Sequence, residues 1–190
     1  MDKATDGGRA FYQAIIGDKI RNANILVCCF ALPRDKWVAK FMNQKDRTQF
    51  FNDGKTLNFK NADPCQFIDQ VMWANIIMFC GGSTKSLMDI LSRMPHWKDN
   101  LLGKTVVGSS AGAYILSSRY LVTDSVPQLA AGLGLLPVII VAHYRSTFIA
   151  DGDMDKAQAF WNKVDDLLRS NTDTGDMITL KEGQFQVIMQ

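Results

Sequence analysis

Mostly apolar runs, separated by amphipathic segments, constrain the fold of this chain more than any other feature. Such runs occupy 24–31, 74–80, 104–108 and 138–141. Short runs without alternating polar residues are typical of strands buried on both faces of a sheet. Apolar residues recur at helical spacing in 9–21, 35–51, 63–71 and 86–94, and residues 153–169 are expected to form a long polar helix. This alternation predicts an α/β protein with three layers, in which a mostly parallel sheet has helices on both faces.

The segments between these elements complete the prediction. A short strand is expected at 56–59, and Asp63-Pro64 is expected to open the helix that follows it. After Gly112 we expect a helical stretch and then a loop. Residues 177–180 and 185–188 are expected to close the chain as a hairpin. No repeat, low-complexity tract or linker-like break divides the sequence, which predicts one domain over residues 1–190.

Composition excludes several classes of protein. The chain is 47% hydrophobic and 21% charged, which excludes a disordered or fibrous protein. The 21 Lys and Arg residues are mixed along the chain with 19 Asp and Glu residues, so nucleic acid is not an expected partner. No window is long and apolar enough to cross a membrane, and the first residues lack the apolar stretch of a signal peptide. The cytoplasm is therefore the expected location.

Four cysteines occur, and three of them lie in strand-like apolar runs. No pair has the spacing of metal ligands, and a reducing compartment keeps such residues as thiols. We expect all of them to act as small buried hydrophobic side chains, and we expect no metal or other cofactor. They are Cys28, Cys29, Cys65 and Cys80.

Residues 108–112 match G-x-S-x-G, the pattern of a nucleophile elbow. In such an elbow a serine, here Ser110, sits on a sharp turn between a strand and a helix, so that its hydroxyl stands clear of the sheet. The N–H of Ala111 would then lie at the start of a helix, where it can stabilise an oxyanion. A purely structural turn between a strand and a helix is the alternative.

A serine nucleophile needs a base, and the chain has only two histidines. His96 lies in a connection before a predicted strand, so it is expected at the sheet edge opposite Ser110. His143 directly follows a buried strand and is expected at the same edge as Ser110. Together with the elbow, this favours His143 as a general base over a structural histidine.

An imidazole base needs an acid to orient it, and two acids qualify. Asp124 lies in the loop after the elbow helix, and Glu182 lies in the predicted final turn. Their positions in the sequence do not decide between them. Gly81-Gly82, at another strand end, would supply a second oxyanion donor or form an ordinary tight turn.

Taken together, these motifs resemble serine peptidase family S51, which includes aspartyl dipeptidase (dipeptidase E) and cyanophycinase. That family has a flavodoxin-like fold of the class I glutamine amidotransferase type, a G-G-N-T loop, a G-x-S-A-G-A elbow and a P-H-[YF] strand end. The matching segments are 81–84, 108–113 and 142–144, with further matches at 123–127, 134–137 and 181–183.

The resemblance implies acyl transfer by Ser110 and His143, with Asp124 or Glu182 as the third member of the triad and no metal. Gly82 and Ala111 would form the oxyanion hole. It also implies a small peptide substrate and an N-terminal aspartate preference. The sequence leaves the oligomeric state open, with a homodimer as one alternative. An aspartate preference requires a cation, for which Arg145 and Arg119 are candidates, and a solvated surface charge is the alternative for each. The residues expected to contact substrate are Ser83, Thr84, Tyr144 and Arg145.

The sequence departs from the family pattern at three places. Ser83 replaces asparagine, Ala142 replaces proline, and the chain begins almost at the glycine turn that follows the family's first strand. A first strand is therefore expected to be missing or to lie upstream. Two other functions stay open, an α/β-hydrolase-like esterase and a non-catalytic ligand-binding relative of the same fold.

Overall fold

A computed structural model describes residues 6–17, 21–52, 54–123, 126–171, 176–181 and 184–188. It is a mixed α/β protein with a parallel sheet, as the sequence predicts. The chain divides into two compact units, Met1–Gly112 and Ala113–Gln190, and each contains a four-stranded sheet. No described helix is both long and apolar enough to cross a membrane.

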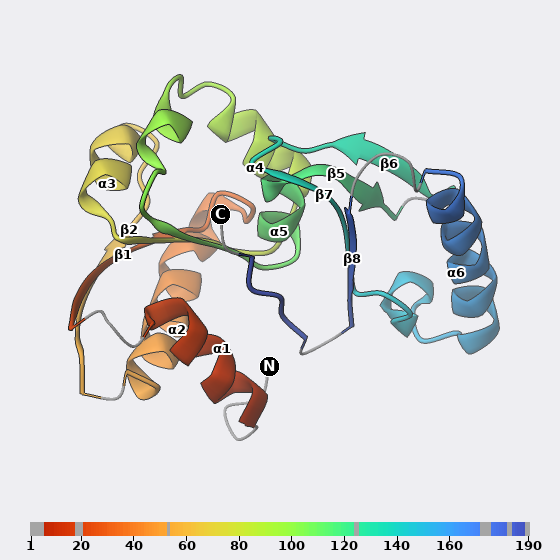
Figure 1. The fold of residues 1–190 in the computed structure, drawn as a ribbon, viewed down its shortest axis with the longest axis horizontal. Coiled ribbons are helices and arrows are strands. Elements are labelled where there is room, and N and C mark those ends of the chain that lie inside the picture. Colours follow the sequence, from red (N-terminus) through yellow and green to blue (C-terminus); the bar gives the residue numbers. More distant parts are fainter. Residues whose placement is uncertain are drawn as a thin grey trace. The chain divides into compact units, whose positions relative to one another are not determined.

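The first unit is built on a fully parallel sheet with strand order β2-β1-β3-β4. Its strands are β1 (Asn22–Cys28), β2 (Thr56–Asn61), β3 (Ile76–Phe79) and β4 (Thr105–Gly108). Its helices are α1 (Asp6–Ile16), α2 (Trp37–Phe50), α3 (Phe67–Trp73) and α4 (Thr84–Leu91), with short 3₁₀ turns at Arg34–Lys36 and Trp97–Asn100. Figure 1 shows α2 and α3 on opposite sides of this sheet.

The central strands of this unit are buried as their composition requires. The side chains of Ile25, Ile76 and Ile77 are fully buried. An aromatic cluster packs beside them, where the ring of Phe67 lies 5.4 Å from that of Phe30 and 5.6 Å from that of Trp97. Apolar burial on this scale is the main favourable term in folding, which explains why these runs are strands despite their short length.

One helix of this unit begins later than predicted. We expected Asp63-Pro64 to open it, but α3 begins at Phe67. The carboxylate of Asp63 accepts a hydrogen bond from the backbone N–H of Cys65 at 2.9 Å, and the side-chain oxygen of Gln70 accepts one from the N–H of Asp63 at 2.8 Å. Asp63 therefore closes a separate turn before the helix.

The second unit has a mixed sheet with strand order β6-β5-β7-β8. Its strands are β5 (Ser117–Val122), β6 (Gln128–Ala131), β7 (Leu136–Ala142) and β8 (Asp176–Leu180), and only the β5–β6 pair is antiparallel. Its helices are α5 (Ala111–Leu116), which starts in the first unit, and α6 (Met154–Arg169), with a 3₁₀ turn at Thr147–Ala150.

Strand β7 is the centre of this unit's core because its side chains alternate between two clusters. Ile139 and Val141 pack with Trp161 and other residues of α6. Val138, Ile140 and Ala142 pack with Tyr114 of α5. The strand is therefore covered on both faces, as its unbroken apolar run predicts.

Two predictions for this half of the chain were wrong. Residues 117–122 and 128–131 are strands β5 and β6, where we expected helix and loop. The closing hairpin is also absent among the described residues, because β8 pairs in parallel with β7 and residues 184–188 form no strand. Instead, Lys181 and Gln184 bond to each other. The N–H of Lys181 donates to the side chain of Gln184 at 2.8 Å, and the N–H of Gln184 donates to the carbonyl of Lys181 at 3.1 Å.

The cysteine prediction was right at three of the four positions. Cys28, Cys29 and Cys80 are buried thiols, but Cys65 is exposed in the turn before α3. In the described part of the chain, no group of three or more His, Cys, Asp and Glu side chains is placed to hold a metal ion.

Candidate active site

Ser110 occupies the turn between β4 and α5, with a backbone φ of 52°. This left-handed value is unusual for a residue other than glycine and costs about 1 kcal/mol or more. Such strain at a serine between a strand and a helix is typical of a nucleophile elbow. The turn is closed by a hydrogen bond of 2.9 Å from the N–H of Gly112 to the carbonyl of Ser109.

Glycine at position 112 is a steric requirement of this turn. A Cβ atom there would overlap the carbonyl group of Phe79, and would stand only 2.9 Å from the Cβ of Phe79. The backbone of the elbow therefore passes directly over the end of the neighbouring strand β3. The N–H of Ser109 donates to the Phe79 carbonyl at 3.0 Å and fixes this approach.

The Gly81-Gly82 loop follows β3 and lies beside Ser110. A Cβ at Gly81 would stand 3.1 Å from the Cβ of Ser110. Gly82 has a φ of 142°, and a Cβ there would overlap the carbonyl of Ala31. The N–H of Ser83 donates to that same carbonyl at 2.8 Å. Glycine is thus required at position 82, and a side chain at position 81 would crowd the elbow.

Ser83 and Thr84 stand at the start of α4. The Oγ of Ser83 caps this helix by accepting a hydrogen bond of 3.1 Å from the N–H of Ser86. Serine and asparagine cap helices about equally well, so replacement of the family's asparagine preserves this function. Contact of Ser83 and Thr84 with substrate stays a prediction.

A pair of thiols lies at the ends of β1 and β3, directly before the glycine loop. The Sγ of Cys29 donates a hydrogen bond to the Sγ of Cys80 at 3.8 Å. This hydrogen bond lowers the pKa of the Cys80 thiol and raises that of Cys29, although burial of Cys80 opposes the first effect. Burial also raises the pKa of Cys28.

His143 follows β7 in the second unit and also has a positive φ, of 58°. Strands β5 and β8 run parallel to β7 on either side of it. Ala142 pairs with Leu180 of β8, and the pairing of Tyr120 with Ile140 brings the end of β5 to the same edge. The chain therefore leaves β5 toward residue 124 on one side of His143, and leaves β8 toward residue 182 on the other. Asp124 and Glu182 themselves lie outside the described residues.

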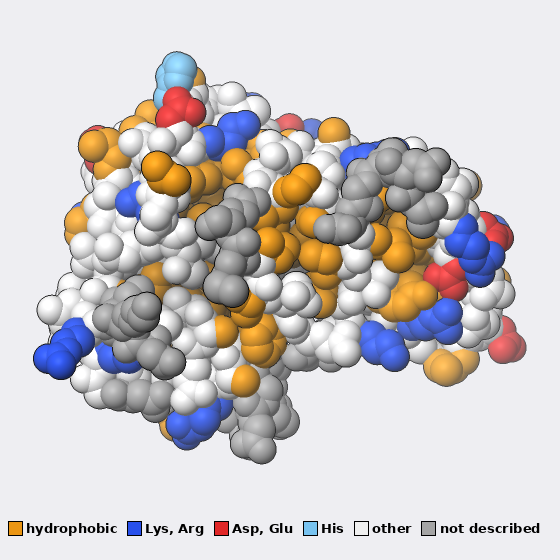
Figure 2. Space-filling model, in the orientation of Figure 1, with side chains coloured by type: hydrophobic (Ala, Val, Ile, Leu, Met, Phe, Trp, Pro, Cys, Tyr) orange, Lys and Arg blue, Asp and Glu red, His pale blue; other side chains and the backbone are white. Residues whose placement is uncertain are grey.

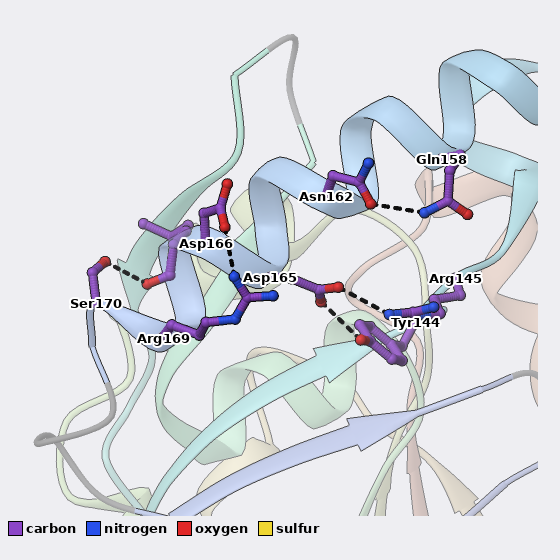
Figure 3. A network of polar contacts seen from close by, with 9 residues as sticks. Tyr144, Arg145, Gln158, Asn162, Asp165, Asp166, Arg169 and Ser170 are labelled. Carbon is purple, nitrogen blue, oxygen red and sulfur yellow. Dashed lines mark hydrogen bonds and ion pairs between the residues drawn. The ribbon is translucent and has the colours of Figure 1, made fainter.

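The two residues after His143 contact a carboxylate that the sequence did not single out (Figure 3). The hydroxyl of Tyr144 donates to Oδ1 of Asp165 at 2.8 Å, and Nη2 of Arg145 donates to Oδ2 at 2.9 Å. Nothing in the local pattern distinguishes Asp165 from the other polar residues of α6. The other arginine considered as a substrate cation, Arg119, donates to the side chain of Asn171 at 2.9 Å.

His96 lies where the sequence predicted, in the connection that leads to β4. It therefore belongs to the edge opposite Ser110. Its Nδ1 lies 3.1 Å from a carboxylate oxygen of Asp99, and its side chain is exposed. This placement agrees with its exclusion as a base.

A cavity of about 330 Å³ opens in the second unit beside α6. Apolar residues form part of its wall, and Lys156 and Lys163 also line it. Lys156 also pairs with Asp153 at 3.0 Å. On the face seen in Figure 2, basic and acidic side chains are interspersed over α6. The lining residues are Thr123, Ile149, Ala150, Lys156, Ala159, Phe160 and Lys163.

The predicted site residues divide between the two units. Ser110, Ala111 and the 81–84 loop belong to the first, and His143, Tyr144 and Arg145 belong to the second. Within the first unit, the structure brings the glycine loop to the side of Ser110. Within the second, it brings the ends of β5 and β8 to the two sides of His143.

Two solved structures share the fold of this chain. A solved structure from Listeria monocytogenes EGD-e, provisionally assigned as a peptidase E, superimposes with a TM-score of 0.59 at 16% identity, over 82% of this chain and 83% of the other. A peptidase structure from an acI-B1 Actinobacterium gives a TM-score of 0.53 at 21% identity, over 80% of this chain and 67% of the other. At these identities the similarity establishes the fold. No curated protein matches the sequence.

The sequence itself is assigned by its match to a family of peptidases. The model of peptidase family S51 matches residues 31–189, which include the glycine loop, the elbow and the His143 strand end. The resemblance noted from the motifs is thereby confirmed over most of the chain. This chain belongs to peptidase family S51, a family of peptide-bond hydrolases.

Proposed function

We propose that this chain is a serine peptidase of exopeptidase or dipeptidase type, which works through an acyl-enzyme with Ser110 as nucleophile. The observation that supports this most directly is the backbone φ of 52° at Ser110 in the β4–α5 turn. A folded protein retains such strain at a serine only where the surroundings enforce it, and here Gly81 and Gly112 let two backbone segments close around the turn.

The chemistry follows the general scheme of acyl transfer. The Ser110 hydroxyl attacks the scissile carbonyl carbon, and His143 takes its proton. The oxyanion that develops accepts hydrogen bonds from the backbone N–H groups of Gly82 and Ala111. His143 then protonates the leaving amine, and water, activated by the same imidazole, releases the acyl group from Ser110.

We assign the orientation of His143 to Asp124, with Glu182 as a second carboxylate near the site. Support for both comes from the sheet, because β5 and β8 flank β7 and end at the same edge as His143. Comparison of Asp124→Asn with Glu182→Gln tests the assignment. The variant of the orienting acid should lose roughly 10⁴-fold in kcat, as expected when a base is left in the wrong tautomer.

The proposed substrates are small peptides, and those with an N-terminal aspartate are the first to test. Recognition of an acidic side chain requires a cation. Arg145 and Arg119 already contact Asp165 and Asn171. A preference for aspartate that depends on Arg145 would therefore require its guanidinium to bind Asp165 and the substrate together.

We also propose that the chain forms a single domain, that it works in the cytoplasm and that its chemistry requires no metal.

A serine-directed fluorophosphonate and a dipeptide panel test the proposal together. We expect the probe to label Ser110 in the native chain, and we expect no labelling in Ser110→Ala or His143→Ala. We also expect peptide hydrolysis that falls by at least ~10³-fold in Ser110→Ala. Turnover of esters without any peptide hydrolysis would instead indicate an esterase, and absence of labelling would indicate a non-catalytic relative.

A further inference from the structure

We propose that Asp165 is a positioning residue for His143, which holds the turn that carries the imidazole. The proposal deepens the proposed function, since it assumes that His143 is the base. Asp165 lies on α6, and its carboxylate binds the side chains of the two residues that follow His143. Only 18% of its side-chain surface is exposed, whereas neighbouring Asp166 is 75% exposed. In Figure 3 the carboxylate of Asp165 reaches Tyr144 and Arg145, whereas that of Asp166 pairs with Arg169.

The turn needs such support because of its backbone conformation. His143 has a φ of 58° and Arg145 a φ of 59°, and neither is glycine. Two left-handed residues of this kind within three positions persist only when contacts outside the turn enforce them. Inside the turn, the N–H of Ser146 donates to the carbonyl of His143 at 2.9 Å.

Contacts from three other elements hold the backbone of the same turn. The indole N–H of Trp161 donates to the Ser146 carbonyl at 2.9 Å, and the N–H of Tyr144 donates to the Leu180 carbonyl at 3.0 Å. On the preceding side, the hydroxyl of Tyr114 donates to the Ala142 carbonyl at 3.2 Å. These contacts fix where the turn lies, so loss of Asp165 is not expected to unfold it.

Asp165 connects the side chains of Tyr144 and Arg145 to helix α6. The Tyr144 ring packs edge-on against Trp161, with centroids 5.4 Å apart, and the Arg145 guanidinium lies 5.3 Å from the Tyr144 ring centre. Asp165 thus joins a stacked pair of side chains to α6. Because Arg145 is half exposed, the ion pair contributes little to the free energy of unfolding. The main effect of Asp165 is therefore to orient Tyr144 and Arg145, the two residues that follow the proposed base.

The chain offers a direct readout of His143 that does not depend on catalysis. It contains only two histidines, so the imidazole region of an NMR spectrum holds signals from His143 and His96 alone. His96 lies in the other unit and serves as an internal reference. We expect Asp165→Ala to move or broaden the His143 imidazole signals and to leave those of His96 unchanged. The matched control, Asp166→Ala, removes the neighbouring carboxylate of the same helix, which pairs with exposed Arg169 (Figure 3). It should change neither set of signals.

Kinetics supplies the second readout. On a cleaved peptide without an N-terminal aspartate, Asp165→Ala should lower kcat roughly 10- to 100-fold and leave KM within about two-fold, because a misplaced base slows the chemical step more than substrate binding. Asp165→Asn can still accept the Tyr144 hydrogen bond but loses the charge that pairs with Arg145. It should retain intermediate activity, and it replaces the alanine variant if that variant does not fold.

The outcomes separate this proposal from the proposed function. If Asp165→Ala and Asp165→Asn leave the His143 signals as unchanged as Asp166→Ala does, Asp165 does not position the base, whatever the activity. If those signals move but the native chain cleaves no peptide, the positioning role stands and the peptidase proposal fails. A rise in KM with unchanged kcat would overturn the positioning role and assign the Asp165 contacts to substrate binding.

Discussion

A Cβ atom at Gly81 would stand 3.1 Å from the Cβ of Ser110 and 3.7 Å from its hydroxyl oxygen. The space beside the proposed nucleophile therefore depends on the absence of a side chain on the neighbouring loop. The nearest backbone atom to that Cβ, the carbonyl oxygen of Ser109, would also lie at 3.1 Å. Contacts of this length require neighbouring atoms to shift by a few tenths of an ångström, which is a smaller disturbance than the overlap that a Cβ at Gly82 or Gly112 would cause.

Gly81→Ala should therefore reduce reactivity much more than stability. We expect labelling of Ser110 by a fluorophosphonate to slow roughly 10- to 100-fold, since the added methyl narrows the approach to the hydroxyl. Gly54→Ala provides the opposite control. No atom lies within 4 Å of the added methyl, but the φ of Gly54 is +78°. It should destabilise the protein by about 1 kcal/mol and leave the labelling rate unchanged. Equal labelling rates in the two variants would contradict the prediction.

Because the backbone is strained at Ser110, we expect glycine at this position to give a more stable protein than alanine. Glycine adopts a positive φ without cost, so Ser110→Gly should be more stable than Ser110→Ala by about 1 kcal/mol in urea unfolding. At Ser109, whose φ is not positive, the order should reverse, with alanine the more stable by about 0.5–1 kcal/mol. Both Ser110 variants should be inactive. An alanine variant at 110 as stable as the glycine variant would show that the turn is unstrained.

The helix cap at Ser83 predicts a smaller effect on stability. Ser83→Ala removes the acceptor for the Ser86 N–H and should cost about 1 kcal/mol, whereas Ser83→Asn should retain the cap. Ser92→Ala, at the other end of α4, should change the free energy of unfolding by no more than about 0.5 kcal/mol. If Ser83→Asn is destabilised as much as Ser83→Ala, the departure from the family pattern serves something other than capping.

The sequence predicts the buried strands well because burial on both faces leaves a strong local pattern. Strands β1, β3 and β7 each contain a run of buried apolar residues, and all three were found. Strands β5 and β6 were missed because their residues are mixed and partly exposed, with burial that alternates only weakly. Their structure depends on pairing with β7 and with each other, which no local pattern shows.

Some residues of the candidate site could likewise be predicted from a local pattern, and others could not. Ser110 and His143 were predictable because an elbow motif and a strand end mark their places in the sequence. Asp165 was not, because it lies 21 residues beyond Tyr144 and reaches the turn only through the packing of α6 on the sheet. A residue that positions a catalytic group from another element leaves no local pattern to detect.

Exposure, rather than acidity, should decide which cysteine reacts. Cys65 is exposed, whereas Cys28, Cys29 and Cys80 are at most 4% exposed. The hydrogen bond from Cys29 lowers the pKa of Cys80 and favours its thiolate, which is the reactive form, but a reagent must also reach the sulfur. We therefore expect iodoacetamide to modify only Cys65 rapidly in the native protein, and Cys65→Ser to abolish that rapid phase. Unfolding in urea should expose the other three thiols. Rapid modification of Cys80 in native Cys65→Ser, detected by peptide mass spectrometry, would show that the strand ends beneath the glycine loop open in solution.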